Sequence, residues 1–104
     1  MSVEDFATCT ADHVGSNRDA VIEEIKKWGQ HEIREFLTWY RGLSDADRAL
    51  FLSLLSLGGG ALVAIISKAI GAAGVEIAIG LVVLVALVGY AILFDAMHDC
   101  SDKL

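Results

Sequence analysis

Charged residues are almost absent from one long stretch of this chain, and that stretch limits what the chain can fold into. Of the 8 basic and 14 acidic residues, only Lys68 and Glu76 lie between Ala49 and Phe94. A water-soluble core made of this stretch would need a covering of amphipathic elements, and the rest of the 104 residues are too few to supply one. Lipid is the alternative solvent, so we expect this half of the chain to lie in a bilayer.

Two charge-free runs within the stretch have the length of transmembrane helices. As α-helices, residues 49–67 and 77–94 would be roughly 28 and 27 Å long, close to the ~30 Å thickness of bilayer hydrocarbon. Their apolar side chains favour insertion by about −3 to −6 and −4 to −7 kcal/mol. The connection between them contains Gly71 and Gly74 and is short, so we expect two antiparallel neighbours.

An amphipathic helix is predicted before the apolar half. Ser16 and Asn17 offer N-cap oxygens, and from there apolar residues recur with a period of 3.6. Gly42 is typical of a residue that follows a helix, and Ser44 with Asp47 is expected to cap the next one. No long periodic pattern precedes this helix.

The sequence therefore predicts an all-α membrane protein with one N-terminal amphipathic helix followed by a two-helix transmembrane hairpin. Its parts are a flexible arm (1–15), a cytoplasmic amphipathic helix (16–43), the hairpin (44–94, with spans at about 49–67 and 77–94) and a polar acidic tail (95–104). Arg34, Arg41 and Arg48 flank the first span, whereas the connecting turn offers only Lys68. The positive-inside rule therefore predicts that both termini are cytoplasmic and that the hairpin lies in the cell membrane.

Small residues follow one another at three- and four-residue spacing along the first span. They are Ser53, Ser56, Gly60, Ala64, Ser67 and Gly71. Close backbone approach along such a stripe favours helix association in lipid, either within the hairpin or between copies of the chain. Three consecutive glycines, residues 58–60, are expected to mark a kink or a very close contact.

Lys68 and Glu76 allow two interpretations. They can lie at the membrane interface, with Lys68 reaching the headgroups and Glu76 in water at the start of its helix. In an oligomer, Glu76 can instead form a ring of carboxylates at the mouth of a cation-selective pore.

The amphipathic helix carries an apolar and aromatic face. Its residues are Ile25, Trp28, Ile33, Phe36, Trp39 and Tyr40. Aromatic rings favour the membrane interface, whereas the acidic residues of the same helix disfavour anionic lipid. A contact with lipid and a contact with a cytoplasmic partner protein both stay open.

Cysteine and histidine residues occur near both ends of the chain. Cys9-x3-His13 and His98-x-Cys100 would supply a Cys2His2 zinc set if the ends met, but the spacing matches no standard zinc motif. Two cysteines make no disulfide framework, and a cytoplasmic location keeps thiols reduced. We therefore expect free thiols, solvated imidazoles and no bound metal.

The sequence favours an interaction in the membrane over catalysis. It contains no phosphate-binding loop, nucleophile elbow or metalloprotease motif, so we expect neither an enzyme nor a cofactor. An acidic chain without basic clusters disfavours nucleic acid as a partner.

The leading hypothesis is self-association in the bilayer into an oligomeric pore, since one hairpin cannot enclose an aqueous path. The layout is similar to that of small phage-type holins, in architecture only. The alternative is a membrane-anchored adaptor or accessory subunit whose amphipathic helix binds a partner protein.

Overall fold

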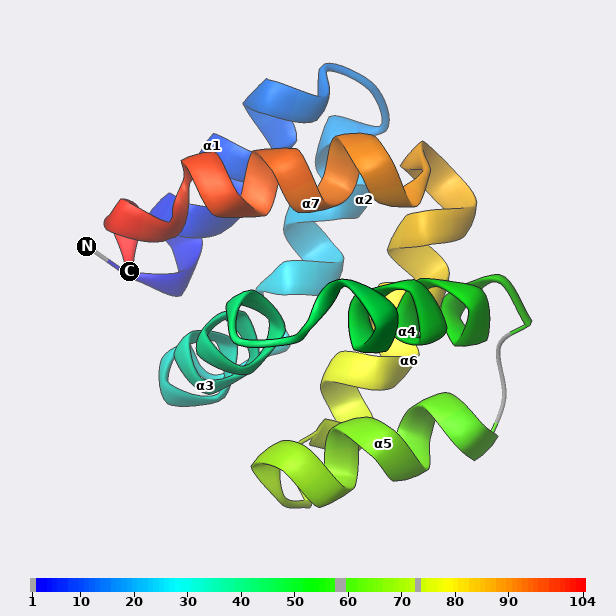
Figure 1. Ribbon diagram of the computed structural model, residues 1–104. Helices are drawn as coiled ribbons and strands as arrows, with labels where there is room; N and C mark the ends of the chain where they lie inside the picture. Colours follow the sequence, from blue (N-terminus) through cyan, green and yellow to red (C-terminus); the bar gives the residue numbers. More distant parts are fainter. Residues whose placement is uncertain (1, 58–59, 73) are drawn as a thin grey trace.

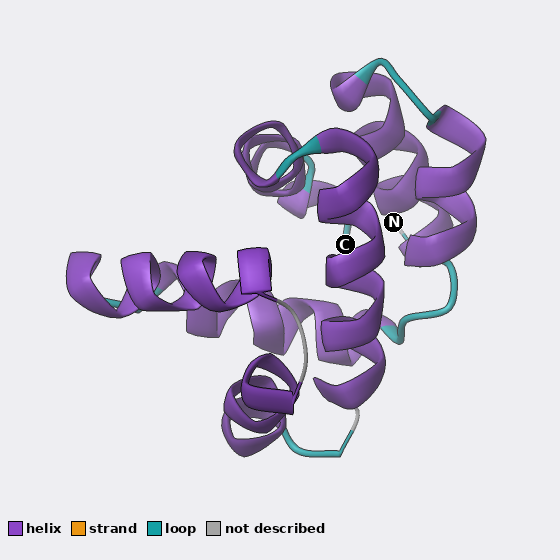
Figure 2. Cartoon of the chain, turned by 90° about the vertical axis from the view of Figure 1, so that its right-hand side faces the viewer, coloured by secondary structure: helices purple, strands orange, loops and turns teal. Residues whose placement is uncertain are grey.

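Helices make up most of the chain, joined by short loops (Figures 1 and 2). The computed structural model describes residues 2–57, 60–72 and 74–104. Within these ranges the helices are α1 (Val3–Val14), α2 (Arg18–Ile25), α3 (Gln30–Arg41), α4 (Asp45–Leu57), α5 (Gly60–Ile70), α6 (Gly74–Val88) and α7 (Tyr90–Asp99), followed by a 3-10 turn, η1 (Ser101–Lys103). The all-α prediction is confirmed for the described residues.

Each of the three long predicted helices is divided in two. The amphipathic helix becomes α2 and α3, and the first apolar run becomes α4 and α5. The second run becomes α6 and α7, which are bent by 114° at Gly89. In the part of the chain that the structure describes, no single helix is long and apolar enough to cross a bilayer. Only the bent pair of α6 and α7 reaches the required length and composition.

Packing of distant side chains explains the break between α2 and α3. Trp28 ends the turn after α2 and lies buried against Gly80 of α6, where an added Cβ would come within 2.6 Å of the indole ring. Gly29 then takes an extended conformation and α3 begins at Gln30. A continuous helix over residues 16–43 is therefore wrong, because the interruption allows α2 and α3 to pack separately against α6.

The first 15 residues also differ from the sequence prediction. Instead of a loose arm they form α1, which starts with a hydrogen bond from the Asp5 amide to the Ser2 hydroxyl (3.1 Å). Gly15, in the left-handed region with a φ of 77°, ends it. Phe6 and Ala11 are fully buried because α1 packs against α2 and α7. The prediction of a flexible arm fails here because tertiary packing orders a helix whose apolar pattern is short.

Helix α6 lies at the centre of the fold. It contacts α2, α3, α4, α5 and α7, and Figure 1 shows it rising from the end of α5 to meet α7. Helices α5 and α6 are neighbours, as the short connection predicts, and they pack most closely where Gly74 meets Ile66. Leu62 and Ile66 of α5 and Leu81 of α6 are fully buried in this contact region.

An aromatic cluster joins α3, α4 and α7. The rings of Tyr40 and Phe94 stack with centroids 4.8 Å apart, and Trp39 meets Phe51 edge-on at 5.3 Å. Arg48 lies 5.2 Å from the Tyr40 ring centroid, a cation–π distance. Burial raises the pKa of the Tyr40 phenol, and the positive charge of Arg48 opposes this shift. The cluster explains why this part of the amphipathic helix is rich in aromatic residues.

The last ten residues are docked rather than extended as a polar tail. Residues 95–99 belong to α7, and Leu104 is buried. Its main-chain oxygen accepts hydrogen bonds from the Gln30 side chain (2.6 Å) and from Arg34. Figure 1 shows η1 close to the start of α1, and these two elements are in contact. The prediction for residues 95–104 is thus correct in polarity but misses their packing against α1 and α3.

Candidate functional site

The outer side of α6 is an exposed aliphatic surface. Val75, Ile79, Val83 and Leu87 follow one another every four residues, and each is more than a third exposed, Ile79 by 57%. We call these four residues the α6 face. The opposite side of the helix is buried in the core. Glu76 is the one charged residue of α6, so this helix has no polar side that could face outward in place of the aliphatic one.

Other large apolar side chains are exposed on the neighbouring helices. Leu50 and Leu57 of α4 and Tyr90 and Ile92 of α7 are each about half exposed or more, with Leu57 at 82%. Single exposed apolar residues are ordinary, but regular rows of them mark surfaces that meet another protein or lipid. The α6 face is such a row.

The predicted stripe of small residues is divided between α4 and α5. Ser53, Gly60, Ala64 and Gly71 are exposed and Ser67 is half-buried, whereas the Ser56 side chain and residues 58–59 lie outside the described part. A Cβ added at Gly60 or at Gly71 would meet nothing within 4 Å. Packing inside this fold therefore does not require their small size.

Gly74, which the sequence predicted only as part of the connection, and Gly80, which it did not single out, make the close contacts instead. An added Cβ at Gly74 would lie 2.8 Å from the Ile66 carbonyl oxygen, and one at Gly80 would overlap Trp28. The spacing of Gly74 and Ala78, both buried, is the small-residue signal that could have identified this contact.

The two charged residues of the apolar half lie at helix ends. Lys68 is exposed in the last turn of α5, and Glu76 is exposed in the first turn of α6. Each charge is favourable with respect to the helix dipole. Both residues lie close to the connection between α5 and α6, at the end of α6 that is far from Gly89.

The apolar face of the amphipathic segment is used inside the fold. Ile25, Ile33 and Phe36 are fully buried and Trp28 nearly so, while Trp39 and Tyr40 are half-buried. They are covered by the chain's own helices, chiefly α6 and the aromatic cluster. In this fold no contact with lipid or with a partner is needed to bury them.

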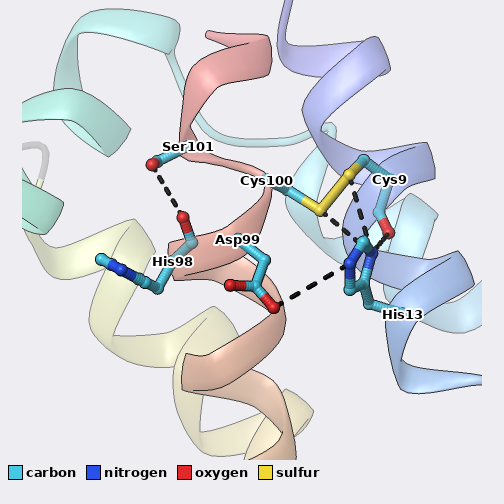
Figure 3. Close-up of polar contacts among 6 residues, drawn as sticks. All are labelled: Cys9, His13, His98, Asp99, Cys100 and Ser101. Atoms are coloured by element: carbon cyan, nitrogen blue, oxygen red, sulfur yellow. Dashed lines mark hydrogen bonds and ion pairs between the residues drawn. A yellow bond between two sulfur atoms is a disulfide. The ribbon is translucent and has the colours of Figure 1, made fainter.

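The two cysteines form a disulfide bond, which corrects the expectation of free thiols. Cys9 of α1 and Cys100 at the end of α7 have Cα atoms 5.8 Å apart (Figure 3). Neither cysteine is free in the described chain. Helices α1 and α7 lie side by side, and this packing brings the two ends of the sequence together.

His13 completes a cluster with the two sulfur atoms. Its Nδ1 lies 3.8 Å from Cys9 Sγ and 3.5 Å from Cys100 Sγ, and its Nε2 lies 4.0 Å from an Asp99 carboxylate oxygen. Cys9, His13 and Cys100 form a group that could hold a metal ion. His98, the fourth residue of the predicted zinc set, points away from the sulfur atoms (Figure 3). We call Cys9, His13 and Cys100 the Cys–His cluster.

Comparison with known proteins finds no match to this chain among family models, curated proteins or solved structures.

Proposed function

We propose that this protein is a small integral membrane protein that self-associates into an oligomeric pore. The α6 face carries the proposal. Its four aliphatic side chains are exposed in a row, and burying them in lipid or against a second copy is favourable by about 25 cal/mol for each Å² removed from water. The charge-free runs on either side of the α5–α6 connection support the same function, since both favour insertion.

In the bilayer, the apolar half would form two antiparallel spans at about residues 49–67 and 77–94. The second span requires α6 and the start of α7 to straighten at Gly89. This residue has a φ of 84°, in a region that glycine enters readily and other residues avoid. Glycine can also adopt helical dihedral angles, at an entropy cost. Helices α6 and α7 can therefore straighten at Gly89 without steric strain.

Contacts between copies would use the exposed small residues of α5. Gly60 and Ala64 are exposed on α5, and a Cβ added at Gly60 would meet nothing within 4 Å, so a second helix can approach closely there. With Ser53 and Ser67 on the same stripe, hydroxyl groups would face the contact or the lumen. Glu76 would then lie at the pore mouth, with Lys68 beside it at the membrane interface.

The proposed location is the cell membrane with both termini in the cytoplasm, on the basis of the three arginines before the first span. This orientation requires the Cys9–Cys100 disulfide of the structure to be reduced inside the cell, because disulfides persist in oxidising compartments and cytoplasmic thiols stay reduced. That requirement gives the orientation a direct test. A membrane-impermeant maleimide applied to intact cells should leave Cys9 and Cys100 unlabelled, and detergent together with a metal chelator should expose both thiols to labelling. Labelling without detergent, or a disulfide that persists in the cells, contradicts the orientation.

The central test of the function is release of a trapped dye from phospholipid vesicles. The wild-type protein should release it, and Val83→Asp should abolish release, because aspartate near the centre of the span at residues 77–94 costs about 3 kcal/mol. Ala20→Asp, which adds the same charge to an exposed position of α2, is the matched control and should behave as wild type. Release by Val83→Asp as fast as by the wild type would overturn the proposal, as would a wild-type protein that releases no dye.

Self-association is tested separately by Gly60→Leu. Open space around Gly60 lets the fold accept the larger side chain, so any loss of oligomers in lipid nanodiscs is attributable to the contact between copies. Ala61→Leu, one residue away on the exposed surface of α5, is the control and should retain them. A wild-type protein that stays monomeric in nanodiscs contradicts the pore.

A further inference from the structure

We propose that Cys9, His13 and Cys100 bind a single Zn²⁺ ion once the Cys9–Cys100 disulfide is reduced. Cys9 and His13 lie one turn apart on α1, and Cys100 follows α7, which packs beside α1 (Figure 3). Their ligand atoms all lie within 4.8 Å of one another. Thiolate sulfur and imidazole nitrogen are the ligands that zinc prefers in proteins.

The separations between the imidazole and the sulfurs already suit a tetrahedral ion. Zn–S and Zn–N bonds of about 2.3 and 2.0–2.1 Å place sulfur and nitrogen ligands about 3.5 Å apart. The Nδ1 atom of His13 lies 3.5 Å from Cys100 Sγ and 3.8 Å from Cys9 Sγ. Only the two sulfur atoms must move apart, to about 3.8 Å on the same tetrahedral geometry.

Asp99 is placed to orient the histidine. Zinc-binding histidines usually donate their second ring N–H to a carboxylate, which selects the tautomer and raises ligand basicity. His13 directs Nδ1 toward the sulfurs and Nε2 toward Asp99, whose carboxylate oxygen is 4.0 Å away. In the disulfide form, Nδ1 also lies 3.1 Å from the Cys9 carbonyl oxygen, so a proton on Nδ1 can be donated there. Zinc binding would shift the proton to Nε2, facing Asp99.

One side of the cluster is open to water. A surface hollow beside it is lined by Cys9 and His13 together with the carboxylates of Asp5, Asp12 and Asp102, and by one ammonium group, that of Lys103. Asp12 is paired with Arg18, 2.7 Å away. The hollow gives a metal ion access from water and leaves a fourth coordination position for a water molecule, as in zinc sites with three protein ligands.

The disulfide and the metal exclude each other, because each sulfur is bonded either to the other sulfur or to zinc. A trialkylphosphine reduces the disulfide: its phosphorus gives up two electrons and takes the oxygen of a water molecule to become the phosphine oxide, and the two protons of that water convert the two sulfurs into thiols. Zn²⁺ then replaces the two thiol protons, which are released to the buffer. The cluster would thus hold either a disulfide or, after reduction, a metal-bound dithiolate.

The experiment is a titration of the full-length protein with Co²⁺, a spectroscopic substitute for zinc, before and after reduction by a phosphine. We expect one Co²⁺ for each reduced chain, with a thiolate-to-cobalt charge-transfer band that added Zn²⁺ abolishes, and no band from the disulfide form. His13→Ala should abolish the band. His98→Ala, the matched control, removes a histidine near the same cysteine and should leave binding unchanged. Asp99→Asn should weaken Zn²⁺ binding about 10- to 100-fold.

Two results would overturn the proposal. One is a reduced wild-type protein, helical by circular dichroism, that gives no charge-transfer band. The other is a His13→Ala variant that binds cobalt as tightly as the wild type does. Equal loss of binding in His98→Ala and His13→Ala would also contradict the assigned ligand set. None of these outcomes depends on whether the protein forms a pore.

Discussion

Removing the Cys9–Cys100 disulfide is expected to lower the free energy of unfolding by about 4–5 kcal/mol. The bond joins residues separated by 91 positions, so it closes nearly the whole chain into one loop. The chain-entropy relation for such a loop gives about 4.6 kcal/mol at 25 °C. Domains are stable by only roughly 5–15 kcal/mol in total, so the loss should shift a urea transition strongly.

The change is best made as Cys9→Ala with Cys100→Ala, and measured by far-UV circular dichroism during urea unfolding. Reduction of the wild-type protein in the presence of a chelator keeps both side chains and should give a similar loss. A loss below about 1 kcal/mol by both routes would refute the reasoning, because it would mean that the ends stay together in the denatured chain. A loss confined to the alanine variant would assign the effect to packing at Cys100, which is fully buried.

Three further predictions concern single side chains. Gly80→Ala should destabilise the fold by about 1–3 kcal/mol because its Cβ would overlap Trp28, whereas Gly60→Ala has open space and should be neutral, both in urea unfolding. Thr10→Val should raise the free energy of unfolding by about 1–3 kcal/mol in the same assay, since the buried Thr10 hydroxyl has no hydrogen-bond partner among the described residues. Because burial raises the pKa of Tyr40, stability should be full below about pH 10 and fall as the pH rises further, and Tyr40→Phe should remove that fall in a pH series of melting curves.

Local signals in the sequence predicted several helix ends correctly. The Asp47 amide donates to the Ser44 hydroxyl (3.2 Å) at the start of α4, as the predicted capping pair requires. Gly42 follows the end of α3, and Gly71, with a φ of 88°, follows the end of α5. These features depend on residues within one helical turn, which is why the sequence alone contains them. Asn17 is a partial exception: it begins α2, but its side chain donates to a distant carbonyl.

The breaks inside the predicted helices depend on distant residues, and the sequence pattern does not reveal them. Apolar periodicity continues through Gly29 with no change of composition. What interrupts the helix is the burial of Trp28 on Gly80, a contact between two segments far apart in the chain. At Gly89 the bend of 114° likewise turns α7 back toward α1 and the aromatic cluster. A hydrophobicity window detects the apolar run but not the direction in which it folds.

The Cys–His cluster shows the same limit for the candidate sites. Cys9 and His13 are four apart, which places them on one side of a helix once a helix is known to form there. Residues 1–15 have no long periodic pattern, so the sequence predicts no helix there and therefore no fixed distance between Cys9 and His13. Cys100 joins them only because α7 packs beside α1. The three residue types were identified from the sequence, and the pairing of the two chain ends required the structure.

Part of the apolar half remains uncovered in this fold. Helices α2 and α3 pack against α5 and α6, so segments from outside the apolar half cover some of it. They do not cover all of it, because a helix that is apolar on every side can hide only the sides that have neighbours. In α6 the uncovered side is Val75, Ile79, Val83 and Leu87, and no rotation of the helix would replace them with polar residues. Only a molecule outside the single chain can therefore bury that row and gain the free energy of doing so. Lipid and a second copy are the two candidates that the proposed pore combines.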